Sequence, residues 1–175
     1  MDCRENLPYF IEYHPYHESI NKKIIDEIIT AEYPLIDATK VRNRDGGISN
    51  LRALTTQYNL SKSSGTLEVL YGWIISILSN NYRGWKFKVY SSWIGKYNKE
   101  HYTVSHNHRP TFISFVYFIK CPKGSSPLVF TTSGKRIKAE EGKLVMFPGY
   151  LRHHVPKNKC DDRIVLAGNI LPISE

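Results

Sequence analysis

The sequence predicts one mainly β domain of 175 residues, an antiparallel sandwich or barrel backed by two N-terminal helices. Three observations support this fold class. The chain has the length of one domain with a substantial core. Two segments in its first half space their apolar residues as helices do, and its second half breaks into short β-branched and aromatic runs. We therefore place a helical support at about 1–84 and the barrel at about 85–175, within one domain, 1–175.

The first expected helix covers residues 19–33, with the sequence "SINKKIIDEIITAEY". Five isoleucines form an apolar stripe along it, which predicts one buried face. Ser19 is a suitable N-cap, because its hydroxyl can accept from a free backbone N–H of the first turn. Pro34 cannot continue a helix, so we expect the helix to end before it.

The second expected helix, residues 66–82, is "TLEVLYGWIISILSNNY". It is apolar nearly all round, which predicts burial against a large surface. The connection between the helices is polar and contains glycine, so we expect loops there and one short strand at about 52–58.

The barrel is predicted from five runs that follow residue 84: "WKFKVYSSWIGKY", "TFISFVYFIK", "SPLVFTT", "KLVMFP" and "RIVLAGNI". Each is rich in Val, Ile, Phe or Tyr, and proline, glycine or Lys-Gly separates one from the next. Short strands with frequent turns are typical of an antiparallel sandwich or barrel.

Composition restricts the environment and the partners. Cys3, Cys121 and Cys160 are odd in number and widely spaced, so they predict free thiols in a reducing compartment rather than a disulfide framework. The N-terminus has no secretory pattern and no run reaches the length of a membrane span, so we expect a soluble, cytoplasmic protein that does not enter membranes. The formal charge of +8 leaves nucleic acid open as a partner, although the basic residues are spread as on a solvated surface.

The chemically distinctive stretch is "HYTVSHNHRPTFISFVYF", residues 101–118. On an extended strand, His106 and His108 would point to one face, and that face would be the barrel interior. Two imidazoles on one inner face can bind a metal ion. A solvated loop or a hydrogen-bonded core pair remains the alternative. The residues expected on the same face are Pro110, Phe112, Ser114 and Val116.

The far end of the chain supplies further candidates. "EGKLVMFPGYLRHHV" contains a strand, a Pro-Gly turn and then His153 and His154, and antiparallel pairing could return one imidazole to the first two. Arg163 opens the strand "RIVLAGNI", where its inward parity is shared with Asn169. An inward guanidinium is a bidentate receptor for a carboxylate, and an ordinary ion pair with a neighbouring aspartate is the alternative.

These motifs together resemble the non-haem Fe(II)- and 2-oxoglutarate-dependent oxygenases, and more narrowly the small, prolyl-hydroxylase-like oxygenases of marine bacteria and their phages. The matching parts are "HNHRPTFISFVYF", "EGKLVMFPGYLRHHV" and "RIVLAGN", which lie within about residues 85–171. The resemblance implies a double-stranded β-helix, that is, a jelly-roll or cupin-like barrel.

The resemblance also implies roles for individual residues. His106 matches the first metal ligand, His153 the distal one, and Arg163 the residue that binds the distal carboxylate of 2-oxoglutarate. The family usually has a carboxylate two positions after its first histidine, but this chain has His108 there. Three neutral imidazoles leave the full charge on the ion and are also a catalytic zinc arrangement.

The implied activity is an Fe(II)-dependent dioxygenase that consumes O2 and 2-oxoglutarate, with His106, His108 and His153 as the candidate metal ligands. Ser114 and Asn169 are candidate polar groups at the cosubstrate site. A peptide or protein side chain is the first expectation for the substrate, and a viral origin would place the reaction in a host cytoplasm. Two alternatives stay open, a cupin-like three-histidine metalloenzyme without 2-oxoglutarate and a non-catalytic basic barrel that binds nucleic acid.

Overall fold

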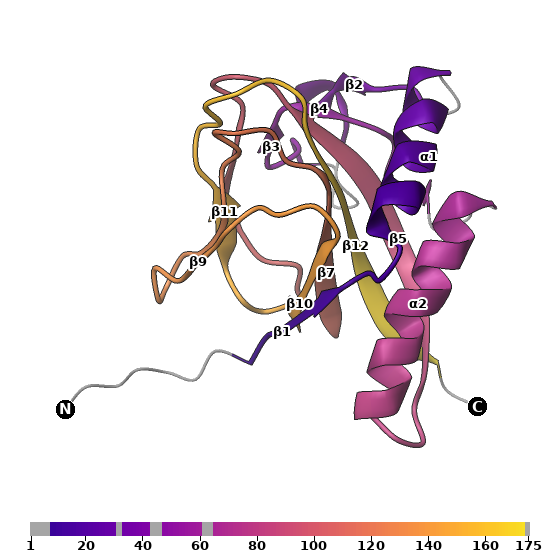
Figure 1. Cartoon of the computed structure of the whole chain (residues 1–175). Coiled ribbons are helices and arrows are strands. Elements are labelled where there is room, and N and C mark those ends of the chain that lie inside the picture. The colour runs from indigo at the N-terminus through magenta and orange to yellow at the C-terminus, as the bar shows by residue number, and fades with distance from the viewer. Residues whose placement is uncertain (1–7, 31–32, 43–46, 61–64, 174–175) are drawn as a thin grey trace.

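Figure 1 shows the computed structural model, which describes residues 8–30, 33–42, 47–60 and 65–173. Its elements follow in chain order: β1 (Phe10–Tyr13), α1 (His17–Ile29), β2 (Ile36–Asp37), the 3-10 helix η1 (Ala38–Lys40), β3 (Leu51–Arg52), β4 (Leu54–Thr55), α2 (Thr66–Asn81), β5 (Lys86–Tyr97), β6 (Tyr102–His106), β7 (Ile113–Lys120), β8 (Leu128–Phe130), β9 (Arg136–Ile137), β10 (Lys143–Pro148), β11 (His153–Val155) and β12 (Arg163–Ile173).

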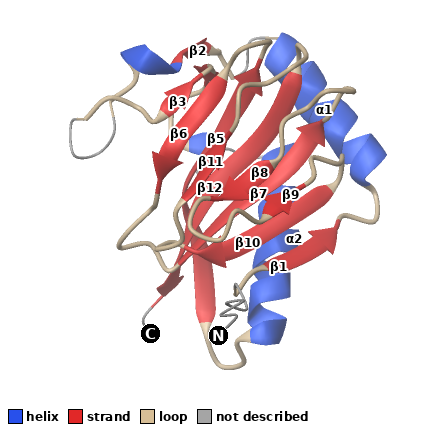
Figure 2. Ribbon diagram, turned by 90° about the vertical axis from the view of Figure 1, so that its left-hand side faces the viewer, coloured by secondary structure: helices blue, strands red, loops and turns tan. Residues whose placement is uncertain are grey.

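Two antiparallel sheets form the barrel. The larger has the strand order β1-β10-β7-β12-β5-β4-β2, and the smaller has the order β3-β6-β11-β8-β9. Figure 2 shows the strands of both sheets on one side of the molecule and the two helices behind them. This arrangement confirms the predicted fold class, a jelly-roll barrel backed by helices. The N-terminal part also contributes four short strands, β1 to β4, to the two sheets.

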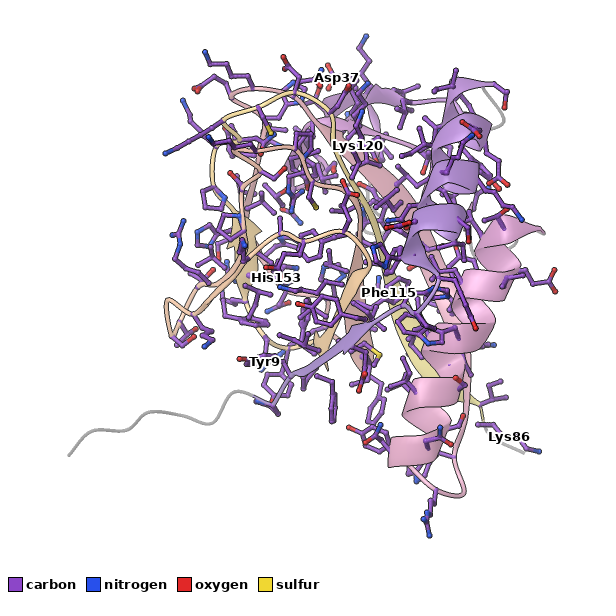
Figure 3. All side chains as sticks on the ribbon, in the orientation of Figure 1. Tyr9, Asp37, Lys86, Phe115, Lys120 and His153 are labelled. Atoms are coloured by element: carbon purple, nitrogen blue, oxygen red, sulfur yellow. The ribbon has the colours of Figure 1, made fainter. Side chains whose placement is uncertain are left out.

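Alternation along the strands separates two cores. On β7, Phe115 and Tyr117 face α1 and α2, whereas Val116 and Phe118 face the barrel interior. Figure 3 shows Phe115 between the sheet and the helices, with His153 inside the barrel. On α2, Leu67, Leu70, Ile74 and Leu78 are fully covered, as predicted, but Val69 and Gly72 lie on an exposed face, so the helix is buried on one side only. Neither described helix is long and apolar enough to cross a membrane.

Details of the N-terminal part correct the sequence predictions. Helix α1 starts at His17, so Ser19 lies inside it, and its hydroxyl donates back to the carbonyl of Tyr16 instead of capping the helix. Of the isoleucine stripe, Ile29 is exposed, because α1 ends beside it. The single strand expected at 52–58 is two strands, β3 and β4, which belong to different sheets.

His14 makes the stability of the fold depend on pH. Its ring is buried, packs edge-on against Trp73 of α2 with 4.7 Å between ring centroids, and accepts the backbone N–H of Tyr16 on Nδ1. Burial, and then the neighbouring His17, lower the pKa of His14 below its usual 6.5. In the unfolded chain, His14 therefore binds a proton near pH 6.5, whereas in the folded chain it binds that proton only at lower pH. The free energy of unfolding falls as pH drops below 6.5.

We expect a His14→Phe variant to lose less thermal stability than the native chain between pH 7.5 and pH 5.5. Thermal unfolding at both pH values measures this difference. An equal drop in melting temperature for both proteins would show that His14 does not contribute.

Candidate metal centre

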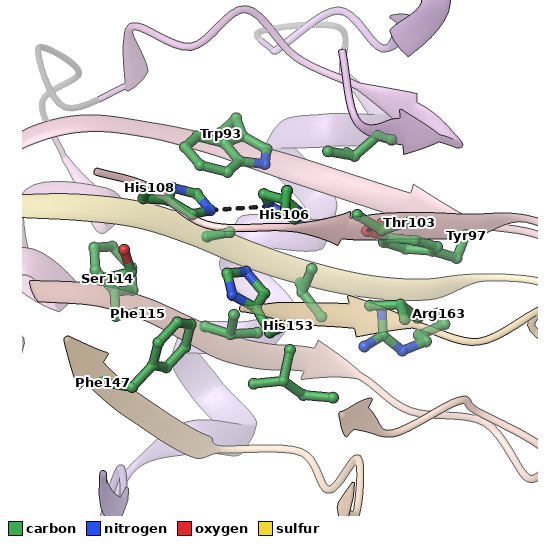
Figure 4. A pocket seen from close by; sticks show the side chains of 16 residues that line it. Trp93, Tyr97, Thr103, His106, His108, Ser114, Phe115, Phe147, His153 and Arg163 are labelled. Carbon is green, nitrogen blue, oxygen red and sulfur yellow. Dashed lines mark hydrogen bonds between the residues drawn. The ribbon is translucent and has the colours of Figure 1, made fainter. Parts of the chain in front are cut away.

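Three histidines from two distant segments of the chain, His106 and His108 from one and His153 from the other, converge inside the barrel. Strands β6 and β11 pair antiparallel, which puts His153 opposite His106. His108 follows two residues after the end of β6. One potential ligand atom from each ring lies within 4.8 Å of the others, and ring centroids are 4.4–5.1 Å apart. Figure 4 shows the three rings turned toward one another between the sheets.

Backbone contacts orient two of the rings. Nδ1 of His106 lies 2.8 Å from the carbonyl oxygen of Val104, and Nδ1 of His153 lies 3.0 Å from that of Leu151. A carbonyl oxygen only accepts, so the proton of each neutral ring sits on Nδ1 and Nε2 keeps its lone pair. Nε2 of His106 and Nε2 of His108 are 3.0 Å apart. Two nitrogens that bind one ion at right angles, each at about 2.1 Å, would have about this separation.

The site contains neutral imidazoles. Burial lowers the pKa of all three histidines, that of His108 to about 3, and the neighbouring imidazoles reinforce the effect at His108 and His153. Unprotonated rings are the form that binds a metal ion. Within the described ranges, no Asp or Glu joins the group. The residues present therefore fit a divalent ion held by three nitrogens and no carboxylate.

The position of His108 differs from the sequence prediction. It does not continue the strand of His106, because β6 ends at His106 and β7 begins only at Ile113. Phe112, expected in the interior, is 37% exposed and stacks on Trp85. Pro110 is exposed in the same loop. The ring of His108 reaches the site from this loop, where it stacks on Trp93 with an interplanar angle of 5°.

Gly149 anchors the loop that carries His108. Its carbonyl accepts the N–H of His108 at 2.7 Å, and its own N–H donates to the carbonyl of Phe112 at 3.1 Å. A Cβ on Gly149 would lie 2.2 Å from the carbonyl oxygen of Thr111. The loop can pass this close only because residue 149 has no side chain.

We expect Gly149→Ala to displace the loop that carries His108 and to weaken metal binding by about tenfold or more. Losses of this size are typical when a contact that orients a metal ligand is removed. Gly72→Ala on the exposed face of α2 is the matched control, since a Cβ there meets nothing within 4 Å. Titration with Co(II) measures both variants. Equal affinities would show that the Gly149 contact does not govern the position of His108.

Arg163 is a buried cation at the other end of the interior. It is 1% exposed, its Nε donates to the carbonyl of Ser126 at 2.9 Å, and its guanidinium lies 4.7 Å from the ring centroid of Tyr97. Nη1 has no hydrogen-bond partner within the described part of the chain. The ion pair considered as an alternative is not formed, because Asp162 pairs with Lys96 and Lys120 and Asp161 accepts the N–H of Lys99.

Two spaces meet at the histidines. An inner cavity of about 40 Å3 extends between the sheets, and both the three histidines and Arg163 line it. An outer groove of about 470 Å3 opens on the other side of His106 and His108. Leu51 and Trp93 line both spaces. The rings of His106 and His108 therefore stand at the junction between the inner cavity, which is mostly apolar, and the accessible outer groove.

The remaining candidates lie close by. Ser114 lines the inner cavity and Asn169 lines the outer groove, and the Ser114 hydroxyl donates to Oδ1 of Asn169 at 3.0 Å. His154 lies outside the group and contacts the hydroxyl of Thr131 through Nδ1. Sequence reasoning missed Trp93, Tyr97 and Thr103 of the inner lining. Alternation along "SSWIGKY" puts Trp93 and Tyr97 on one strand face and could have identified them.

No protein-family model matches the chain, and no curated protein matches it. Several solved structures do match the chain. A viral collagen prolyl hydroxylase from Paramecium Bursaria Chlorella virus-1, in a 2-oxoglutarate complex, has a TM-score of 0.67 at 14% identity, with 95% of this chain and 96% of that chain covered.

Two further solved structures are similar. An oxidoreductase of the 2OG-Fe(II) oxygenase family from Burkholderia pseudomallei has a TM-score of 0.63 at 11% identity over 93% of this chain and 84% of that one. HygX from Streptomyces hygroscopicus, with nickel and 2-oxoglutarate bound, has a TM-score of 0.68 at 8% identity over 93% and 82%. At these identities the likeness shows a shared fold.

Proposed function

We propose that this chain, which has the fold of the 2-oxoglutarate- and Fe(II)-dependent oxygenases, is itself such a dioxygenase. One observation carries the proposal. The inner cavity has a three-histidine group at one end and, at the other, a buried guanidinium whose Nη1 has no hydrogen-bond partner among the described residues. A metal-bound dicarboxylate would satisfy both ends at once.

Each candidate residue has a defined task in this proposal. His106, His153 and His108 would hold Fe(II), and Arg163 would pair with the distal carboxylate of 2-oxoglutarate. Bound Fe(II) with 2-oxoglutarate and O2 supplies the oxidising power that hydroxylates a C–H bond, with release of succinate and CO2. The apolar walls, among them Phe147 and Val165, would exclude water from the reacting groups. Ser114 and Asn169 would contribute polar contacts.

The outer groove is the proposed substrate site, and a peptide or protein side chain the proposed substrate. The groove borders the metal-facing rings of His106 and His108, so a side chain lying in it would come close to the metal. The fold similarity to a collagen prolyl hydroxylase supports this choice. The free thiols Cys121 and Cys160 agree with a reducing cytoplasm, which we propose as the location.

The test is anaerobic reconstitution with Fe(II), followed by titration with 2-oxoglutarate while the visible charge-transfer band of the chelate is recorded. We expect a band that saturates at one 2-oxoglutarate per iron. A protein that binds iron stoichiometrically without forming the band would contradict the role of 2-oxoglutarate.

A second function is favoured by one specific observation, the lack of a carboxylate ligand among the described residues. A cupin-like enzyme with three histidines and no 2-oxoglutarate would need the same metal group but would produce no succinate. Succinate formation in the presence of O2 and candidate peptides therefore separates the two functions.

A further inference from the structure

The outer groove continues along the paired ends of β5 and β12. Leu171 of β12 lines the groove, and its partner across the strand pair is Lys88 of β5. Partners in an antiparallel pair point to the same face of the sheet, so the exposed Lys88 side chain lies on the groove face. Phe87 and Ile170, each the neighbour of one partner, are buried in the core on the opposite face, where the helices pack, which agrees with this assignment.

A β-bulge at Tyr90 puts Lys88 on that face. Asn169 pairs with Ser91, but the next residue of β12 pairs with Val89, so Tyr90 is an extra residue in β5. Tyr90 and Ser91 are adjacent in sequence and both line the groove. Without the extra residue, strict alternation from Ser91 would place Val89 on the groove face and Lys88 on the helix side.

The groove carries positive charge that is open to a partner from solution. Among the described residues that line it, Arg109 alone is charged, and it is exposed in the loop directly after His108. Neither Arg109 nor Lys88 forms an ion pair with a described carboxylate. No described Asp or Glu belongs to the lining. The groove therefore favours an anionic partner.

The carboxylates that connect the strands lie at the opposite end of the barrel. Arg163 begins β12 at that end, and Leu171 lies eight residues further along the strand. At about 3.3 Å per residue, eight residues span about 26 Å, well beyond the screening length of about 8 Å at physiological salt. The acidic residues near the start of β12, in the β5–β6 turn and before β10 are therefore too distant to neutralise the groove; they are Glu100, Glu140, Glu141, Asp161 and Asp162.

The part of the groove next to the histidines is apolar and aromatic. Leu51, Tyr58 and Trp93 line it, and Tyr58 packs edge-on against Trp93 with 4.9 Å between ring centroids. A charged side chain placed there would lose water without gaining a partner of opposite charge. The residue of a substrate that reaches the three histidines should therefore be uncharged, and its acidic groups should lie further along the groove.

We propose that the outer groove binds an acidic peptide segment, with an uncharged residue against Trp93 and with carboxylates that pair with Arg109 and Lys88. The proposal rests on the proposed function and specifies its substrate. A nucleic acid would need a run of cations for successive phosphates, whereas the groove offers two cations around an apolar centre.

The test measures the binding of two labelled peptides to the full chain loaded with Co(II) and 2-oxoglutarate, by fluorescence anisotropy. The peptides have the same length and the same central proline, and one has Glu where the other has Gln. We expect the Glu peptide to bind about 5- to 20-fold more tightly at about 50 mM salt, because each exposed ion pair contributes up to about fivefold. At about 500 mM salt the preference should fall to within about threefold.

Charge reversal locates the preference. Arg109→Glu/Lys88→Glu should abolish the preference for the Glu peptide. Lys123→Glu/Lys159→Glu is the matched control, because it changes the net charge equally at two exposed positions in the β7–β8 and β11–β12 loops, at the Arg163 end of the barrel. We expect the control to keep the preference, and circular dichroism with the visible Co(II) spectrum checks that both variants fold and bind metal.

Several outcomes would overturn the proposal. Equal binding of the two peptides, binding of neither, or an equal loss in the control would each do so. Oligo-dT that displaces the Glu peptide at lower concentration than unlabelled peptide would identify a nucleic-acid groove instead. If the double variant does not fold, Lys88→Glu alone replaces it, and an undiminished preference there would count against the proposal. A native chain that prefers the Glu peptide but forms no 2-oxoglutarate chelate would retain the groove preference and overturn the proposed function.

Discussion

Replacing His153 by alanine is expected to abolish stoichiometric Fe(II) binding while the chain still folds. His153 is the best-buried member of the group, 5% exposed, and it lies opposite His106 on a paired strand. Its removal leaves two nitrogens, and the lost contacts of a buried ring should cost about 1–3 kcal/mol of stability.

His154→Ala is the matched control for that experiment, because His154 is the adjacent residue on the same strand but contacts Thr131 outside the group. Metal analysis after anaerobic reconstitution, with circular dichroism as the check on folding, compares the two variants. One equivalent of iron retained by folded His153→Ala would remove His153 from the centre.

Replacing Arg163 by methionine should separate cosubstrate binding from metal binding. If Arg163 pairs with the distal carboxylate of 2-oxoglutarate, the loss of a buried charge-assisted pair costs about 2–5 kcal/mol. The dissociation constant for 2-oxoglutarate should therefore rise from about 30-fold to several thousand-fold, at 1.4 kcal/mol for each factor of ten. Metal affinity should stay within about threefold, because Arg163 contacts none of the three rings in the described hydrogen bonds.

The same variant should unfold at a higher temperature in the absence of 2-oxoglutarate. Arg163 is a fully buried cation, and among the described residues its Nη1 has no hydrogen-bond partner and no carboxylate pairs with it, so its charge should destabilise the empty fold. Arg136→Met, at an exposed position of β9, is the control. Calorimetry with and without 2-oxoglutarate measures both effects, and an unchanged affinity in Arg163→Met would exclude the assigned role.

Strong hydrophobic runs made most of the fold predictable. β5, β7, β8, β10 and β12 coincide with the five apolar runs of the sequence, because buried strands need continuous apolar residues. β6 was missed, since "YTVSH" is half-exposed and polar at alternate positions. β1 was missed because "FIEY" is short and lies at the edge of the sheet, with an exposed face.

Those side chains of the candidate site that lie on strands could be predicted from the alternation of side chains along each strand. Arg163 and Val165 both line the inner cavity, as alternation along β12 requires. The placement of His108 was not predictable, because it depends on contacts between segments distant in sequence. The backbone of Gly149 and the ring of Trp93 both contact it, and neither contact leaves a periodic pattern in the sequence.

Because His108 lies in a loop, one ligand of the candidate centre can be replaced without a change in any strand of the barrel. Two of the histidines, His106 and His153, lie opposite each other on paired strands. Residue 108 belongs to no strand, and exchange of its imidazole for a carboxylate would lower the charge of a bound centre by one without altering a strand pairing. A histidine-to-aspartate substitution at residue 108 would therefore change the donor set and the charge of the centre, while β6 and β11 kept their pairing.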